Sequence, residues 1–214
     1  MTLSLRTPWL RARAAAWRRR ARRHGELVYV AVGDSAAQGI GARLRSGYVS
    51  RLAERLASAS GRGVRVLNLS RYGARMDDAI AEQLPRLAEL RPDLVTVAVG
   101  ANDMRAFEPA RFSESLDVLL AGLPAHAIVA DLPCFHFGPR EGDAVVASRM
   151  IRERARAARF AVAPLHRVTE VRRGWGSFPE FAWDQFHPSA IGYRVWESAF
   201  AGAVTRRGRE LRRD

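Results

Sequence analysis

A serine at a strand-to-helix junction is the first residue in this chain that could do chemistry. Ser35 lies in the segment Val-Gly-Asp-Ser-Ala-Ala-Gln-Gly, directly after the apolar run Leu27 to Val32. Gly33 ends that run and a helix-like pattern follows, which predicts a strand, a tight turn and a helix. Backbone N–H groups at such a junction point outward and can stabilise negative charge. Ser35 is therefore placed like a nucleophile.

A serine hydroxyl needs a base within hydrogen-bonding reach, and histidine is the usual one. Of the five histidines, His187 is the best placed, because Asp184 precedes it by three residues and Pro188 follows it. Proline biases the preceding residue away from helical geometry, so both side chains come from a loop and can meet. We expect Asp184 to orient one ring nitrogen of His187 while the other takes the proton from Ser35.

Acyl transfer to a serine also creates an oxyanion, and hydrogen-bond donors must face it. The backbone N–H of Ser35 is one candidate. Gly73 is a second, since a glycine in a strand-to-helix loop allows the backbone to approach a ligand closely. Asn102 is the third, because its side-chain amide offers two N–H donors without a charge. We expect Asp34 to hold its own turn and Asp103 to be a turn or helix-capping residue.

Aromatic residues in loops near this site could form a substrate pocket, although such residues also pack as core. We predict substrate contacts for Phe135, His136 and Trp183. The other aromatic candidates in these loops are Phe137, Phe178, Phe181 and Phe186.

These residues need a parallel sheet to bring them together. From Glu26 onward, short β-branched runs alternate with longer amphipathic stretches, which is typical of a parallel sheet covered by helices. The expected strands are 27–32, 64–69, 94–99, 127–131 and 160–163. The expected helices are 48–59, 77–90 with a kink or early break at Pro85, 113–121, 143–158 and 189–204. Three of the candidate blocks follow the first three strands, and the fourth precedes the last helix.

The composition fits one domain, because 214 residues with 48% hydrophobic content suit a single core. Cys134 is the only cysteine, which excludes an internal disulfide, and no cysteine or histidine cluster has metal-ligand spacing. We expect neither a metal nor another cofactor.

The net charge of +13 is concentrated at the two ends of the chain. Residues 1–25 contain eight arginines and no acidic residue, and 201–214 contain five arginines against two acidic residues. We therefore predict an arginine-rich leader at 1–25, a folded domain at 26–204 and a basic tail at 205–214. The basicity indicates nothing about the fold.

The leader has three interpretations. Leu10, Ala14, Trp17 and Ala21 form a narrow apolar stripe that could dock on the chain's own domain or on a partner subunit. Alternatively, the leader is disordered, or it binds an anionic membrane or nucleic acid through residues 1–24. Arginines interrupt any signal-like apolar segment, and no run is long enough to span a membrane. These features predict a soluble, cytoplasmic protein, with peripheral membrane contact left open.

The four blocks together resemble a known family. Gly33-Asp34-Ser35, Gly73, Gly100-Ala101-Asn102-Asp103 and Asp184-Gln185-Phe186-His187 resemble, in order and approximate spacing, the signature blocks of the SGNH hydrolases, also called GDSL esterases or lipases. The resemblance covers roughly 27–204. It implies a flavodoxin-like three-layer α/β/α sandwich, a triad of Ser35, His187 and Asp184, and an oxyanion hole from Ser35, Gly73 and Asn102. One departure is Ala36, where the family pattern has leucine.

The expected activity is hydrolysis of a small-molecule carboxylic ester through an acyl-enzyme on Ser35, as in esterases, lipases or carbohydrate deacetylases. Acyl transfer or thioester hydrolysis at the same site is an alternative. A catalytically idle α/β adaptor that binds anionic partners through its arginine-rich ends is another.

Overall fold

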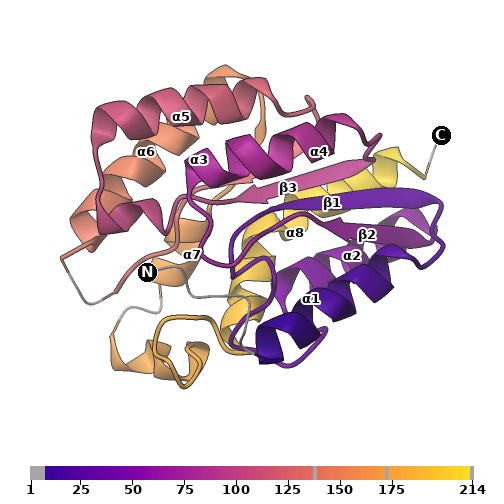
Figure 1. Ribbon diagram of the computed structural model, residues 1–214, viewed down its shortest axis with the longest axis horizontal. Coiled ribbons are helices and arrows are strands. Elements are labelled where there is room, and N and C mark those ends of the chain that lie inside the picture. The colour runs from indigo at the N-terminus through magenta and orange to yellow at the C-terminus, as the bar shows by residue number, and fades with distance from the viewer. Residues whose placement is uncertain (1–7, 137–138, 172–173, 213–214) are drawn as a thin grey trace.

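A five-stranded parallel sheet forms the centre of the computed structural model, which describes residues 8–136, 139–171 and 174–212. The strand order is β2-β1-β3-β4-β5, and Figure 1 shows helices on both faces of the sheet. The strands are β1 (Leu27–Gly33), β2 (Val64–Asn68), β3 (Leu94–Ala98), β4 (Ala127–Ala130) and β5 (Ala161–Ala163). Each lies within one residue of its predicted bounds, so the predicted α/β fold is confirmed.

The strand order places the ends of β1 and β3 next to each other. In the register, Gly33 at the end of β1 is opposite Ala98 at the end of β3, and Ala31 is opposite Asn68 at the end of β2. Residues that follow these three strands therefore leave the sheet at one edge.

Two apolar layers hold the helices against the sheet. On one face, α2 (Tyr48–Ser60) and α8 (Gly192–Glu210) pack together, and the rings of Tyr48 and Phe200 stack with centroids 5.5 Å apart. A short helix that the sequence did not predict, α7 (Leu165–Glu170), adjoins α8. The other face carries α5 (Pro109–Ala121), α6 (Glu141–Ala157) and the broken helix that follows β2.

The helix predicted at 77–90 is interrupted, as expected from Pro85. It consists of α3 (Met76–Asp78), a π-helical segment (Ala79–Gln83) and α4 (Leu84–Ala88). Pro85 occupies the first turn of α4, where its missing N–H is tolerated. The π-helical segment matters for the site, because it ends at the buried Gln83.

The last helix corrects the predicted C-terminal tail. Helix α8 runs to Glu210 rather than ending at 204, and Val204 and Leu211 are buried in the core. The described part of the predicted tail, 205–212, therefore continues the folded domain. The basic charge predicted a separate tail, but Val204, Gly208 and Leu211 recur at helical spacing and are buried.

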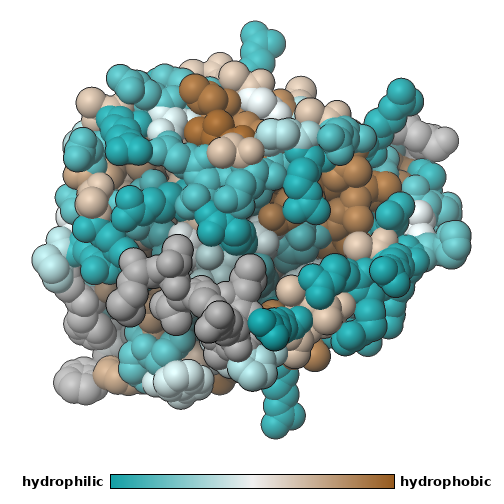
Figure 2. Space-filling view, viewed as in Figure 1, coloured by the Kyte–Doolittle hydropathy of each residue, from teal (hydrophilic) through white to brown (hydrophobic). Residues whose placement is uncertain are grey.

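The leader forms helix α1 (Pro8–Ala21), which packs along the edge strand β2. Leu10 is buried, and Trp17 packs against the core and donates from Nε1 to the carbonyl oxygen of Gln38 at 3.1 Å. In the structure, the apolar stripe of 8–21 therefore lies against the chain's own domain, while residues 1–7 lie outside the described residues. Figure 2 shows hydrophobic residues gathered between α4 and α1, where a groove includes Leu67 and Leu90. Among the described helices, none is long and apolar enough to cross a membrane.

Candidate active site

Three side chains from two distant parts of the chain form a hydrogen-bonded row. Nε2 of His187 lies 2.9 Å from Oγ of Ser35, and Nδ1 of His187 lies 2.7 Å from Oδ2 of Asp184. Ser35 and His187 are buried, and Asp184 is half-buried. The arrangement allows His187 to take a proton from the hydroxyl while its other nitrogen stays bonded to the carboxylate.

The turn that carries Ser35 is held from three sides. The N–H of Ala36 donates to Oδ1 of Asp34 at 2.9 Å, so Asp34 closes its own turn as predicted. The side-chain amide of Gln83 both accepts from the N–H of Gly33 and donates to its carbonyl oxygen, each at 2.9 Å. A Cβ added to Gly33 would lie 2.6 Å from the carbonyl oxygen of Ala98, so only glycine fits there. Sequence reasoning missed Gln83, because an amide within a helical segment carries no local signal.

The loop that carries His187 is organised by Asp184 itself. Its Oδ1 accepts the backbone N–H groups of Phe186 and His187, at 3.1 and 2.9 Å. Burial alone raises the pKa of Asp184, but these hydrogen bonds and the one from the His187 ring outweigh it. The pKa of Asp184 therefore lies below its ordinary value, and the group is a carboxylate at neutral pH.

Ser35 and Gly73 each present a backbone N–H that donates to no acceptor among the described residues. Gly73 is exposed and has a φ of +71°, a conformation that favours glycine. Its neighbours point to the site: the ring centroid of Tyr72 lies 5.9 Å from that of His187, and the carbonyl oxygen of Ala74 accepts from Asn102.

Asn102 is buried and held by two acceptors. Its Nδ2 donates to Oδ2 of Asp34 at 3.2 Å and to the carbonyl oxygen of Ala74 at 3.1 Å. Both amide hydrogens are therefore engaged within the protein. Burial raises the pKa of Asp34 to about 7, and the charge of Asp103 adds to the effect. Asp103 has the structural role predicted for it, because its carboxylate accepts the N–H of Met76.

A cavity of about 330 Å³ opens beside Ser35 and His187. Its walls come from the turn of Ser35, the segment after β4, and the loops before α8. The aromatic side chains that line it are Phe135, His136, Phe178, Phe181, Phe186 and Trp196. Such an apolar cavity next to a polar row is typical of a site for a small organic ligand.

Residues 31–195 match the GDSL-like Lipase/Acylhydrolase family. This match spans more than half of the chain. The chain belongs to that family.

Individual relatives agree with the family assignment. The chain is 36% identical over 86 residues to the esterase TesA of Pseudomonas aeruginosa, and this alignment spans 40% of the chain but only 42% of that esterase. A crystal structure of TesA is similar with a TM-score of 0.68 and 26% identity, covering 84% of this chain and 99% of that one.

Two further solved structures share the fold. The lipase/acylhydrolase of Enterococcus faecalis has a TM-score of 0.72 at 20% identity and covers 85% of this chain and 96% of its own. The W215I variant of the acetyl xylan esterase Axe2 of Geobacillus stearothermophilus has a TM-score of 0.70 at 20% identity. The alignment covers 84% of this chain and 94% of the Axe2 chain.

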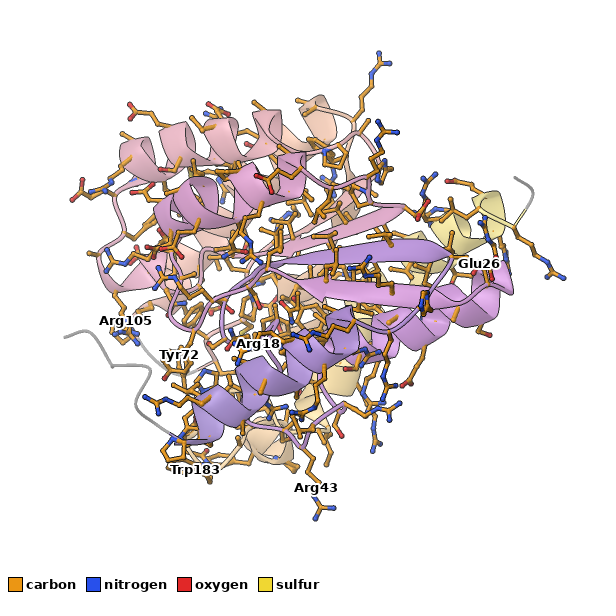
Figure 3. The ribbon with its side chains drawn as sticks, turned by 45° about the vertical axis from the view of Figure 1, so that its right-hand side comes forward. Arg18, Glu26, Arg43, Tyr72, Arg105 and Trp183 are labelled. Atoms are coloured by element: carbon orange, nitrogen blue, oxygen red, sulfur yellow. The ribbon has the colours of Figure 1, made fainter. Side chains whose placement is uncertain are left out.

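The cavity of this GDSL-family chain includes two of the three predicted substrate contacts. Phe135 and His136 line it, and the ring of His136 meets that of Phe181 edge-on with centroids 5.4 Å apart. The third, Trp183, does not line the cavity, and its side chain is 90% exposed. Trp183 precedes the tight loop that buries His187. Figure 3 shows its side chain pointing outward, at the same end of the molecule as Tyr72. Phe137 lies outside the described residues.

A group of three side chains that spacing along the sequence did not indicate adjoins the cavity through Cys134, which lines it. Cys134, Glu141 and His166 bring one potential ligand atom each within 4.8 Å of one another, so their chemistry could hold a metal ion. In the structure these groups contact each other and the backbone. Sγ of Cys134 donates to Oε1 of Glu141 at 3.4 Å, and the N–H of Phe135 donates to Oε2 at 2.6 Å. These contacts fix the segment that carries Phe135 and His136.

Proposed function

We propose that this chain is a serine hydrolase that cleaves small carboxylic esters through an acyl-enzyme on Ser35. The observation that carries the proposal is the row from Ser35 through His187 to Asp184, which lies beside an apolar cavity. The esterase and lipase names of related proteins support the reaction class.

In the acylation step, Oγ of Ser35 attacks the ester carbonyl carbon while Nε2 of His187 accepts the hydroxyl proton. Asp184 stays ionised and stabilises the imidazolium, which its low pKa favours. The tetrahedral intermediate then collapses, the C–O bond of the ester breaks, and His187 returns the proton to the departing alcohol. In deacylation, water attacks the carbonyl carbon of the acyl-enzyme while His187 accepts its proton. The bond to Oγ of Ser35 then breaks, His187 returns the proton to Ser35, and the acid is released.

We assign the stabilisation of the oxyanion to three hydrogen-bond donors: the backbone N–H groups of Ser35 and Gly73 and the side-chain amide of Asn102. The two backbone donors have no protein acceptor among the described residues, which supports this role. The amide of Asn102 has to exchange its contact with Ala74 for the oxyanion, while Asp34 keeps holding the other hydrogen. Such exchanges are common, because catalytic hydrogen bonds often form fully only with substrate bound.

The aromatic cavity is assigned to the acyl group. Its volume of about 330 Å³ is at the small end of ligand pockets, so short acyl chains fit better than long ones. Phe135, Phe178 and Phe181 supply apolar walls for such a chain.

The test compares Ser35→Ala with Ser198→Ala, a serine on the exposed side of α8. With p-nitrophenyl esters of increasing chain length, the parent chain and Ser198→Ala should turn over and Ser35→Ala should lose nearly all activity. A fluorophosphonate should label the parent chain at Ser35 alone. Full turnover by Ser35→Ala, or labelling elsewhere, would exclude this mechanism.

A further inference from the structure

A second pocket lies between α1 and the segment that leads into α2, away from the ester cavity. Its volume is about 180 Å³, which is room for several water molecules or for one small anion. Five of its nine lining residues are arginines and none is acidic; the arginines are Arg13, Arg19, Arg20, Arg23 and Arg45. This small concave surface therefore gathers five like charges with no opposite charge in its lining.

The partners of these arginines leave their charge uncompensated. Arg13 donates to the carbonyl oxygen of Ala42, and Arg20 donates to Oγ of Ser50 at 2.8 Å, so both partners are neutral. Arg19, Arg23 and Arg45 form no ion pair with a carboxylate of the described residues.

Arginines elsewhere on the surface do find carboxylates. Arg55 pairs with Glu197 at 2.5 Å, and Arg152 pairs with Asp131 at 2.7 Å. Many other described arginines also form no ion pair, so the distinguishing feature of this pocket is that five arginines line one small volume without an acidic residue.

The crowding acts on the arginines themselves. Burial lowers the pKa of Arg20, and the like charges of Arg45 and Arg23 lower it further, against the opposite effect of Glu54, which does not line the pocket. Arg45 also has a φ of +73°, a strained conformation for a residue with a side chain. An anion in the pocket would relieve this repulsion.

We propose that this pocket binds a phosphate group with two or more negative charges. Guanidinium groups present paired N–H donors that match phosphate oxygens, and several of them around one small volume neutralise a dianion. The hydroxyl of Ser50 adds a further polar contact in the lining, and the Trp17 side chain forms an apolar wall. The phosphate can come from a soluble phosphate ester or diphosphate, or from the headgroup of an acidic phospholipid.

The site is independent of the proposed ester hydrolysis, because it uses neither Ser35 nor His187. The test is therefore binding, measured on the full chain by calorimetry with pyrophosphate at physiological ionic strength. The test variant is the double change Arg23→Ala with Arg45→Ala. Its matched control is Arg18→Ala with Arg22→Ala, which removes the same charge from exposed positions outside the pocket. Arg18 does not line the pocket but lines the groove that includes Leu67 and Leu90; Figure 3 labels it on α1.

We expect saturable binding of one pyrophosphate, weakened at least about tenfold by the test pair and less than about twofold by the control pair. Thermal unfolding of both pairs checks that the helix remains folded. Equal weakening by both pairs would show unspecific attraction and overturn the site, as would failure of the parent chain to bind pyrophosphate.

Vesicles of phosphatidylcholine with and without phosphatidic acid separate the two sources of phosphate. If the parent chain and the control pair bind the acidic vesicles and the test pair does not, the site is supported and its ligand is a lipid headgroup. Saturable pyrophosphate binding without vesicle binding supports the site and assigns a soluble phosphate.

Discussion

Oδ2 of Asp34 accepts a hydrogen bond from Nδ2 of Asn102 at 3.2 Å, which joins the turn after β1 to the turn after β3. The same carboxylate holds the N–H of Ala36 through Oδ1. Asp34 thus positions both the serine turn and the amide assigned to the oxyanion, although it touches neither the hydroxyl nor His187 in the described contacts.

Replacing Asp34 by asparagine should reduce kcat about tenfold. An NH2 group then replaces the carboxylate oxygen Oδ2, and Asn102 loses the acceptor that holds its side chain. KM should change little. Asp77→Asn, which alters an exposed carboxylate that pairs with Arg111, should leave both constants unchanged. Steady-state kinetics on a p-nitrophenyl ester measures the effect, and an unaltered kcat would remove Asp34 from the positioning role.

The same residue predicts a pH dependence of stability. Because burial raises the pKa of Asp34 to about 7, the folded state binds a proton there more tightly than the unfolded state does. Its contribution is full at low pH and is lost as pH rises from about 4 to about 7. Relative to Asp34→Asn, the parent chain should lose on the order of 3 kcal/mol of unfolding free energy between pH 4 and 8.

Urea unfolding of both chains across this range measures that difference. Comparing the two variants cancels the titration of the other groups, apart from the coupling of Asp34 to Asp103. A constant difference would show that Asp34 keeps an ordinary pKa.

Asn102→Ala should lower kcat by about a hundredfold or more, because it removes a donor assigned to the oxyanion. The variant also leaves Oδ2 of Asp34 without its partner, so thermal unfolding should accompany the kinetics. An effect confined to KM would make Asn102 a substrate-binding residue instead.

Gly41 should tolerate no side chain, although sequence reasoning did not single it out. Its φ is +91°, and an added Cβ would lie 2.6 Å from the carbonyl oxygen of Pro188 and 2.9 Å from Cβ of His187. Gly41→Ala should therefore cost about 2–4 kcal/mol of stability and lower kcat by displacing His187.

Gly61→Ala is the matched control for this change. Gly61 has a φ of +72°, but an added Cβ would meet no atom within 4 Å. It should cost only the backbone strain, about 1 kcal/mol, with unchanged kcat. Equal effects on kcat would show that packing against His187 is not the cause.

Trp17→Ala should destabilise the whole domain by about 2–3 kcal/mol, since Trp17 packs against the core and bonds to Gln38. Trp183→Ala, which removes a side chain that is 90% exposed, should change stability by less than about 0.5 kcal/mol. Equilibrium unfolding in urea tests whether α1 is part of the cooperative unit. An unchanged free energy of unfolding in Trp17→Ala would show that α1 is not part of the cooperative unit.

The five strands, the break at Pro85 and the residues of the candidate triad were all predictable from the sequence. Periodicity, turn residues and the spacing of Asp184 and His187 are local signals, and a parallel sheet must collect the ends of its strands at one edge. For the two ends of the chain, the sequence predicted the net charge but not the packing, because whether a helix docks depends on the surface that receives it.

Only the tertiary structure could reveal the roles of Gln83 and Gly41, the solvent-facing position of Trp183 and the five-arginine pocket. Gln83 holds Gly33 from a segment 50 residues away, and the arginines converge from α1 and the segment before α2. Such contacts depend on how elements pack, and a sequence pattern with a period of two or 3.6 residues contains no information about which distant atoms will meet. The sequence by itself determined the elements and the chemistry available to them, and packing decided which of those groups share a site.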